Sequence, residues 1–330
     1  MNTMNTMNTM NYTRSEAKSY ARANLKGIWA AALTPFTSDL RLDEPGFERN
    51  IRHWIDDLGI AGLFVGGKQG EFFSMSVEER KRLLEVAVDA AGGRGQTMMS
   101  CSDQNLDVVL DLARHAQEAG ADYIVVHAPM LHFFEEQDET VFRYYETVSR
   151  EVAIGMALWS HPDSGYLMSP QLCNRLADLD NVVAIKYSVP RAMYAELTAL
   201  ASDRIQVSTA SEVEWLDNIV ELGWQLYLCS SPPCLIQTAE DRRMHDYTRA
   251  ALAGDVAAAR RISETLNPVR DALKRTRPAE KPHAHQKYWQ ELLGQVGGYV
   301  RPPLLELTDN EKSATREVFL RCGLGAPANP

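Results

Sequence analysis

The chain has 330 residues, 45% of them hydrophobic and 24% charged, which is enough for one large α/β domain or two smaller domains. Its formal net charge of −10 argues against nucleic acid or an anionic membrane surface as a partner. No apolar run approaches the ~20 residues that a membrane-spanning helix needs. The five cysteines are scattered without a CxxC spacing, so we expect reduced thiols in a cytoplasmic protein, with neither a disulfide framework nor a structural zinc site.

The N-terminus repeats Met-Asn-Thr three times and lacks the basic and apolar regions of a signal peptide. Polar termini of this kind are seldom tied to a domain, so we predict a disordered tail over residues 1–20.

From residue 27 onwards, short apolar segments alternate with segments of helical periodicity. The apolar segments predict strands at 27–33, 60–65, 97–101, 123–127, 153–159, 181–186, 205–208 and 225–229. About eight strand–helix units in succession predict a closed (β/α)8 TIM barrel over residues 21–233. An open, doubly wound sheet is the alternative, but it usually carries a glycine-rich first turn, and no GxGxxG follows the first strand.

After Cys234 the pattern is purely helical, which predicts a C-terminal helical domain over residues 234–330. No long Gly/Ser/Pro linker precedes it. We therefore expect this domain to pack on the barrel.

Lys186 ends the sixth predicted strand, an apolar segment typical of a strand buried on both faces. In a barrel of this type, the residues at the strand ends face the active site. A lysine without water has a lowered pKa and is a nucleophile that forms Schiff bases with carbonyl compounds. The alternative is a structural lysine whose ammonium group reaches solvent.

The loop after the second predicted strand has glycines at positions 66, 67 and 70. Glycines let backbone N–H groups approach an anion closely, so this loop could bind a carboxylate or phosphate. A tight turn without a ligand is the alternative. Thr34 ends the first strand, either as a simple terminator or with its hydroxyl directed at the site.

Four motifs carry a resemblance: Thr34-Pro35-Phe36, Gly67-Lys68-Gln69-Gly70-Glu71, Ala184-Ile185-Lys186 and Val300-Arg301-Pro302-Pro303-Leu304. In order and spacing they resemble the dihydrodipicolinate synthase / N-acetylneuraminate lyase family, over about residues 26–325. The resemblance implies a class I aldolase or related lyase on a (β/α)8 barrel with a C-terminal helical domain, as a homotetramer or homodimer. It implies that Lys186 forms the Schiff base with pyruvate or another 2-oxo acid, without a further cofactor. It also assigns Gly67 and Thr34 to the carboxylate and proton-relay side.

The chain departs from the family pattern at several positions. Lys68 and Gln69 stand where the family usually has two hydroxyl residues, and the catalytic tyrosine is replaced by Trp159 or, aligned without gaps, Leu158. The arginine of the synthase would fall near Asp163 or Ser164. These differences argue against the reaction of lysine biosynthesis.

Two branches of the family remain open. Residues 158–163 resemble the hydratase-aldolases that cleave aryl-substituted unsaturated 2-oxo acids, whereas residues 66–74 resemble the sugar-acid dehydratases. The family's tyrosine pair corresponds to Met130 and Leu131 here. Together with Trp159 and Phe133 these residues predict an apolar mouth and a hydrophobic or aromatic aldehyde as partner, although Phe133 could equally be packing in the core or at a subunit contact.

We therefore predict Lys186, His161 and Thr34 as catalytic residues, with His161 preferred over Tyr187 as the proton carrier because histidine titrates near neutral pH. Predicted substrate-binding residues are Gly67, Lys68, Gln69, Trp159, Ser208 and Leu131. We expect no metal, because His127, His132 and His161 show no HxH or HExxH spacing. The predicted function is a Schiff-base lyase acting on a 2-oxo acid and an aldehyde. A catalytically silent, metabolite-binding homologue is the alternative.

Overall fold

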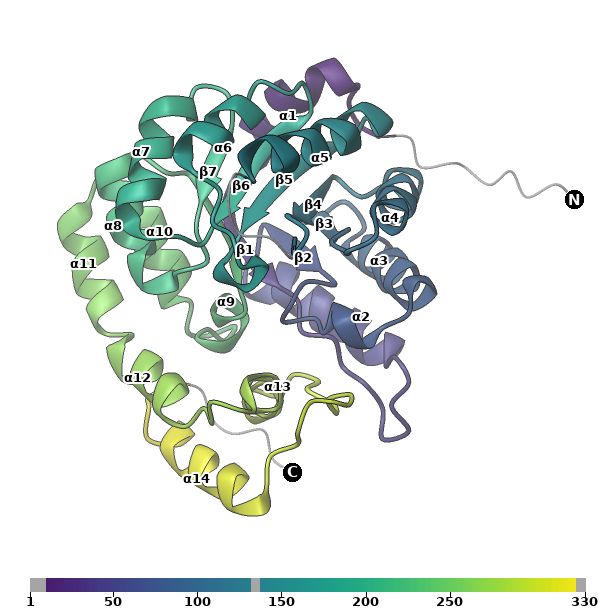
Figure 1. Ribbon diagram of the computed structural model, residues 1–330. Helices are drawn as coiled ribbons and strands as arrows, with labels where there is room; N and C mark the ends of the chain where they lie inside the picture. The colour runs from purple at the N-terminus through teal and green to yellow at the C-terminus, as the bar shows by residue number, and fades with distance from the viewer. Residues whose placement is uncertain (1–9, 132–136, 325–330) are drawn as a thin grey trace, which may run out of the picture.

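The computed structural model describes residues 10–131 and 137–324. Eight parallel strands follow one another around a ring in chain order, and β8 pairs with β1 (Figure 1). The strands are β1 Gly27–Ala31, β2 Gly62–Val65, β3 Gln96–Ser100, β4 Tyr123–His127, β5 Gly155–Ser160, β6 Val182–Tyr187, β7 Gln206–Ser208 and β8 Leu226–Ser230. The prediction of a (β/α)8 barrel is confirmed.

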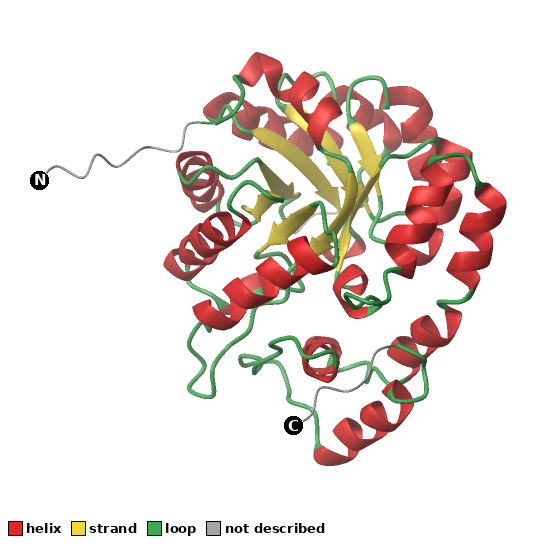
Figure 2. Ribbon diagram, turned by 180° about the vertical axis from the view of Figure 1, so that it is seen from behind, coloured by secondary structure: helices red, strands yellow, loops and turns green. Residues whose placement is uncertain are grey.

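Helices surround the strand ring on its outer side (Figure 2). They are α2 Glu44–Arg52, α3 Val77–Ala91, α4 Leu106–Glu118, α5 Asp138–Glu151, α6 Pro170–Leu176, α7 Arg191–Ala201 and α8 Trp215–Leu222, with α10 Arg243–Leu252 packed against α8. Their starts follow from local chemistry. The Ser76 side chain accepts from the Glu79 N–H, and Glu79 reciprocates, which completes the predicted capping box of α3.

Ser208 joins the last two strands of the ring. Its buried hydroxyl donates to the Leu226 carbonyl at 2.8 Å and accepts from the Leu228 N–H at 2.8 Å. Both functions of the hydroxyl are thus used between β7 and β8. Ser208 was predicted to bind substrate, but the structure places it in the barrel wall.

The remaining C-terminal helices form an arm beside and beyond one end of the barrel (Figure 1). They are α11 Val256–Glu264, α12 Asn267–Arg275, α13 Pro282–Leu292 and α14 Asp309–Phe319, whereas the short α9 Pro232–Leu235 packs against β1. The predicted boundary between residues 233 and 234 falls inside α9. In the described part of the chain, no helix is long and apolar enough to cross a membrane.

The prediction of a disordered tail over residues 1–20 is wrong for its later part, while residues 1–9 lie outside the described residues. A short 3-10 turn, Arg14–Glu16, leads into α1, Ala17–Asn24. Tyr12 is buried at the amino ends of the strands, where its hydroxyl donates to the Asp122 carbonyl and accepts from the Gly155 N–H at 2.8 Å. The segment was predicted to be disordered because most of its residues are polar. Its apolar residues Tyr12, Ala17 and Ala21 are nevertheless spaced so that all three pack in one buried cluster on the barrel.

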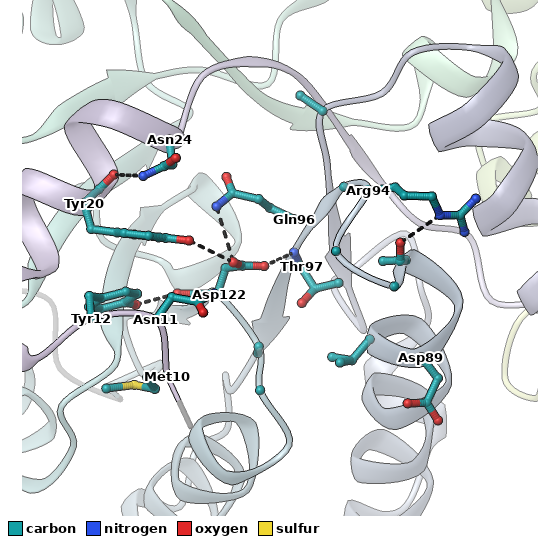
Figure 3. A pocket seen from close by; sticks show the side chains of 18 residues that line it. Met10, Asn11, Tyr12, Tyr20, Asn24, Asp89, Arg94, Gln96, Thr97 and Asp122 are labelled. Atoms are coloured by element: carbon teal, nitrogen blue, oxygen red, sulfur yellow. Dashed lines mark hydrogen bonds between the residues drawn. The ribbon is translucent and has the colours of Figure 1, made fainter. Parts of the chain in front are cut away.

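The same segment borders a cavity of about 670 Å³ at this end of the barrel (Figure 3). The Asp122 carboxylate accepts hydrogen bonds there from the Thr97 N–H at 2.8 Å and from the Tyr20 hydroxyl. Burial raises the pKa of Asp122. Because Asp122 precedes β4 whereas Lys186 lies near the carboxyl end of β6, this cavity is at the opposite end of the barrel from Lys186.

We expect Tyr12→Phe to lower the free energy of unfolding by about 1–3 kcal/mol, because the buried Gly155 N–H loses its acceptor. Chemical denaturation measures this change. Tyr299→Phe, at a half-exposed side chain, is the matched control and should be close to neutral. Equal effects of the two substitutions would show that the Tyr12 hydroxyl does not hold the N-terminal segment.

Candidate active site

Lys186 is buried near the carboxyl end of β6 with only 2% of its surface exposed. Its Nζ lies 5.0 Å from the centre of the Phe64 ring and 4.7 Å from that of Trp159. Across residues 10–131 and 137–324, no group forms a hydrogen bond or ion pair with this amine. Burial lowers the pKa of Lys186, opposed by the Cys229 thiol and assisted by the charge of Lys68. A buried amine without a counterion is favoured in its neutral, nucleophilic form.

A pocket of about 410 Å³ opens onto Lys186 between the barrel and the C-terminal helices. The barrel contributes Trp159 of β5 and, from the loops after its strands, Lys68, Gln69, His161 and Ser188. The C-terminal domain contributes Pro282, His283 and Gln286 of α13, together with Arg277 and Ala279 from the connection between α12 and α13. Of the predicted site residues, the structure thus brings Lys186, Lys68, Gln69, Trp159 and His161 together, whereas Thr34, Gly67, Ser208 and Leu131 do not line this pocket.

The glycine loop after β2 is held by close packing. Gly66 has a positive φ of 63°, and a Cβ on Gly67 would lie 2.6 Å from the Phe64 ring, so a side chain at either position would disturb the turn. The buried Thr34 hydroxyl donates to the Gly70 carbonyl at 2.9 Å. Thr34 was predicted to relay protons in the site. In the structure its hydroxyl is bonded to the backbone of the glycine loop, which it supports.

Glu71, the last residue of this loop, forms a fully buried ion pair with Lys287 of α13 at 2.5 Å. Its second oxygen accepts from the Arg301 N–H at 3.1 Å. Lys287 and Arg301 both lie over the Phe36 ring, at 4.6 and 4.1 Å. Three of the four sequence motifs therefore meet in one cluster beneath the loop. Nothing in the sequence pattern indicated the roles of Lys287 or Arg301.

The C-terminal domain also touches the loop near its tip. His283 of α13 lies with its Nε2 2.9 Å from the Lys68 carbonyl oxygen. Its Nδ1 has no hydrogen-bond partner among the described residues. Burial lowers the pKa of His283, so the ring is neutral at pH 7 and donates from Nε2. The loop conformation therefore depends on α13 as well as on the barrel.

Lys68 and His161 share one carboxylate. The Lys68 ammonium is paired with Asp163, and the same carboxylate lies 3.2 Å from His161 Nδ1. His161 Nδ1 also accepts from the Asp163 N–H at 3.1 Å, which requires that nitrogen to be unprotonated. Burial lowers the pKa of His161 despite the opposing effect of Asp163, so we favour the neutral ring with its proton on Nε2.

Trp159 takes the place beside Lys186 in the adjacent strand. Its ring packs edge-on against Phe64 and against His127, with ring centres 5.6 and 4.7 Å apart, and burial lowers the pKa of His127 to about 4. The indole Nε1 is buried without a partner in the described chain.

The predicted apolar mouth is only partly present. Met130 is 45% exposed and Leu131 packs against the barrel core, while His132 and Phe133 lie outside the described residues. Neither Met130 nor Leu131 lines the pocket. The described outer wall instead carries three polar residues, Arg277, His283 and Gln286, beside Ala279 and Pro282. No cluster of three metal-ligating side chains occurs in the described parts of the chain.

Comparisons with known proteins agree with this architecture. The model of the dihydrodipicolinate synthetase family matches residues 24–320. A 4-hydroxy-tetrahydrodipicolinate synthase from Methanothrix thermoacetophila is 25% identical over 90% of this chain and 96% of its own. An N-acetylneuraminate lyase from Clostridium perfringens is 33% identical, over 50% of this chain and 57% of its own.

Solved structures show the same fold. YagE, a prophage protein of the dihydrodipicolinic acid synthase family from E. coli K12 solved in complex with pyruvate, superposes with a TM-score of 0.81 at 25% identity, covering 91% of this chain and 99% of its own. An N-acetylneuraminate lyase from Fusobacterium nucleatum superposes with a TM-score of 0.80 at 23% identity, covering 91% and 99%.

The lowered pKa of Lys186 makes a prediction about stability. In the unfolded chain the Lys186 amine is protonated below about pH 10.4, the ordinary lysine pKa. In the folded chain the pKa of Lys186 is lower, so protonation requires a lower pH. Because the unfolded state then binds more protons than the folded state, the free energy of unfolding decreases as pH falls below about 10.4. We expect Lys186→Met to raise Tm by about 2–5 °C at pH 7, with the gain shrinking as pH rises toward 10.

Lys274→Met, at an exposed lysine of α12, is the matched control and should change Tm little at any pH. Scanning calorimetry from pH 6 to 10 measures both variants. A loss of Tm in Lys186→Met at pH 7 would mean that the folded protein stabilises a charged Lys186.

Proposed function

The chain belongs to the dihydrodipicolinate synthetase family, whose members are Schiff-base aldolases and lyases, and from this premise we propose that Lys186 forms an imine with a 2-oxo acid. The observation that carries the proposal is the buried amine of Lys186 without a counterion at the base of the pocket. A structural lysine would be expected to keep water or a carboxylate near its ammonium group.

The chemistry follows from a neutral amine. Nζ attacks the ketone carbon of the 2-oxo acid to give a carbinolamine, which loses water to form the imine. The protonated imine withdraws electrons, so a proton leaves the adjacent carbon and an enamine results. The enamine carbon then adds to an aldehyde, and the reverse sequence cleaves the product. Hydrolysis of the imine returns Lys186.

Groups for the substrate carboxylate come from the glycine loop. Within residues 10–131 and 137–324, the backbone N–H groups of Lys68 and Gln69 donate no hydrogen bond. They are therefore available to a substrate carboxylate. The Lys68 ammonium adds a positive charge, although Asp163 competes for it. We infer that a substrate carboxylate bound here either shares the Lys68 ammonium with Asp163 or replaces Asp163 as its partner.

The nature of the second substrate is part of the proposal. Trp159 favours the hydrophobic or aromatic aldehyde expected from the sequence. The polar wall of Arg277, His283 and Gln286 favours the other branch, a sugar-acid dehydratase, because such groups can hydrogen-bond a polar substrate. The wall is an observation in favour of the dehydratase as second candidate. A cytoplasmic location and a homotetramer or homodimer complete the proposal.

Reductive trapping tests the imine. Incubation with pyruvate and borohydride should add one reduced pyruvyl group per chain, and Lys186→Met should abolish the addition. Intact-protein mass spectrometry detects the adduct, and peptide mapping locates it. Lys68→Met is the matched control and should retain the adduct. An adduct mapped to Lys68 would move the nucleophile, and the absence of any adduct would favour the silent, metabolite-binding homologue.

His161 is the proposed proton carrier. We expect His161→Asn to keep the pyruvate adduct at Lys186 and to lower turnover by about 10²–10⁴, the usual range for general acid–base catalysis. Because the pKa of His161 is lowered, the acid limb of the pH–rate profile should lie below 6.5 and disappear in the variant. His53→Asn, at a ring outside the pocket, should leave the profile unchanged. Near-normal turnover in His161→Asn would assign proton transfer to water or the substrate.

A further inference from the structure

Arg277 stands out among the charged residues of the pocket. It lies in the connection between α12 and α13 and borders the same pocket as Lys186. The side chain is exposed, and its guanidinium forms no hydrogen bond or ion pair with any residue that the structure describes. This cation therefore has no anion of its own in the described protein.

The other charges near the pocket are already committed. Lys68 is paired with Asp163, and Asp163 also contacts His161. Glu71 is buried with Lys287 and the Arg301 N–H beneath the loop. No described carboxylate in the pocket is therefore left to neutralise Arg277.

Arg277 is also the one charged residue among the described pocket residues of the C-terminal domain. The neighbouring pocket residues from the C-terminal domain are neutral: His283, whose pKa burial lowers, Gln286, Ala279 and Pro282. Lys186 and the glycine loop belong to the barrel side of the pocket. We expect the remaining atoms of a substrate joined to Lys186 to extend toward the C-terminal wall, because this wall lines the same pocket.

We propose that Arg277 binds a second carboxylate of the substrate, and that the enzyme selects 2-oxo acids carrying such a group at the end distant from the ketone. The planar guanidinium matches a carboxylate with two parallel hydrogen bonds, which gives direction as well as charge. This inference rests on the proposed imine at Lys186 and names the substrate class for it.

A matched pair of ligands tests the inference. 2-Oxoglutarate and 2-oxopentanoate have the same carbon chain, but only the first ends in a carboxylate. The readout is the ligand concentration that gives half-maximal borohydride-trapped adduct at Lys186. We expect a concentration about 10-fold or more lower for 2-oxoglutarate, since charge-assisted hydrogen bonds are the stronger ones. The preference should shrink in high salt because Arg277 is exposed.

Variants assign the preference to the residue. Arg277→Gln should remove the preference for 2-oxoglutarate, and half-maximal trapping by pyruvate, which has no second carboxylate, should change much less. Arg277→Lys should retain part of it, because charge remains but the two-pronged geometry is lost. Arg275→Gln, at an exposed arginine in the last turn of α12 that does not line the pocket, should behave like the wild type.

The outcomes separate the two proposals. No Lys186-dependent adduct with pyruvate would overturn the proposed function, and this inference with it. A pyruvate adduct together with equal trapping of the two matched acids would overturn the role of Arg277 alone. A preference that survives Arg277→Gln would also overturn that role and assign the second carboxylate to another cation such as Lys68.

Discussion

The buried ion pair between Glu71 and Lys287 connects the two halves of the candidate site. Glu71 ends the glycine loop of the barrel, and Lys287 belongs to α13 of the C-terminal domain. Removing one member of such a pair leaves an uncompensated buried charge, which typically costs about 3–5 kcal/mol. The loop and the outer wall are thereby held in one arrangement, and the pocket over Lys186 lies between them.

The site treats its charged groups in opposite ways. Glu71 and Lys287 are buried and paired, so they serve as support. Lys186 is buried beside Phe64 and Trp159 without an anion. This burial lowers the stability of the fold and leaves the amine unpaired among the described residues. Lys68 lies between these cases, because it raises the local positive potential while Asp163 keeps it partly neutralised.

Side-chain direction explains why several predicted site residues do not line the pocket. Ser208 ends β7 and Thr34 follows β1 by three residues, yet their hydroxyls bond to β8 and to Gly70 inside the protein. Leu131 follows β4 but packs against the core. Strand ends can be located from apolar runs, whereas the partner that a hydroxyl chooses depends on neighbouring strands that are distant in sequence.

The sequence by itself determined the barrel, the family and the place of Lys186, because alternating periodicity and motif spacing are local properties of a chain. It also indicated Lys68, Gln69, Trp159 and His161, which do line the pocket. Only the tertiary structure decided that Tyr12 closes the amino end of the barrel and that Arg277 and His283 complete the pocket. These residues come from the two ends of the chain. The hydrogen bonds of Tyr12 and His283 join segments more than 100 positions apart, which no local pattern encodes.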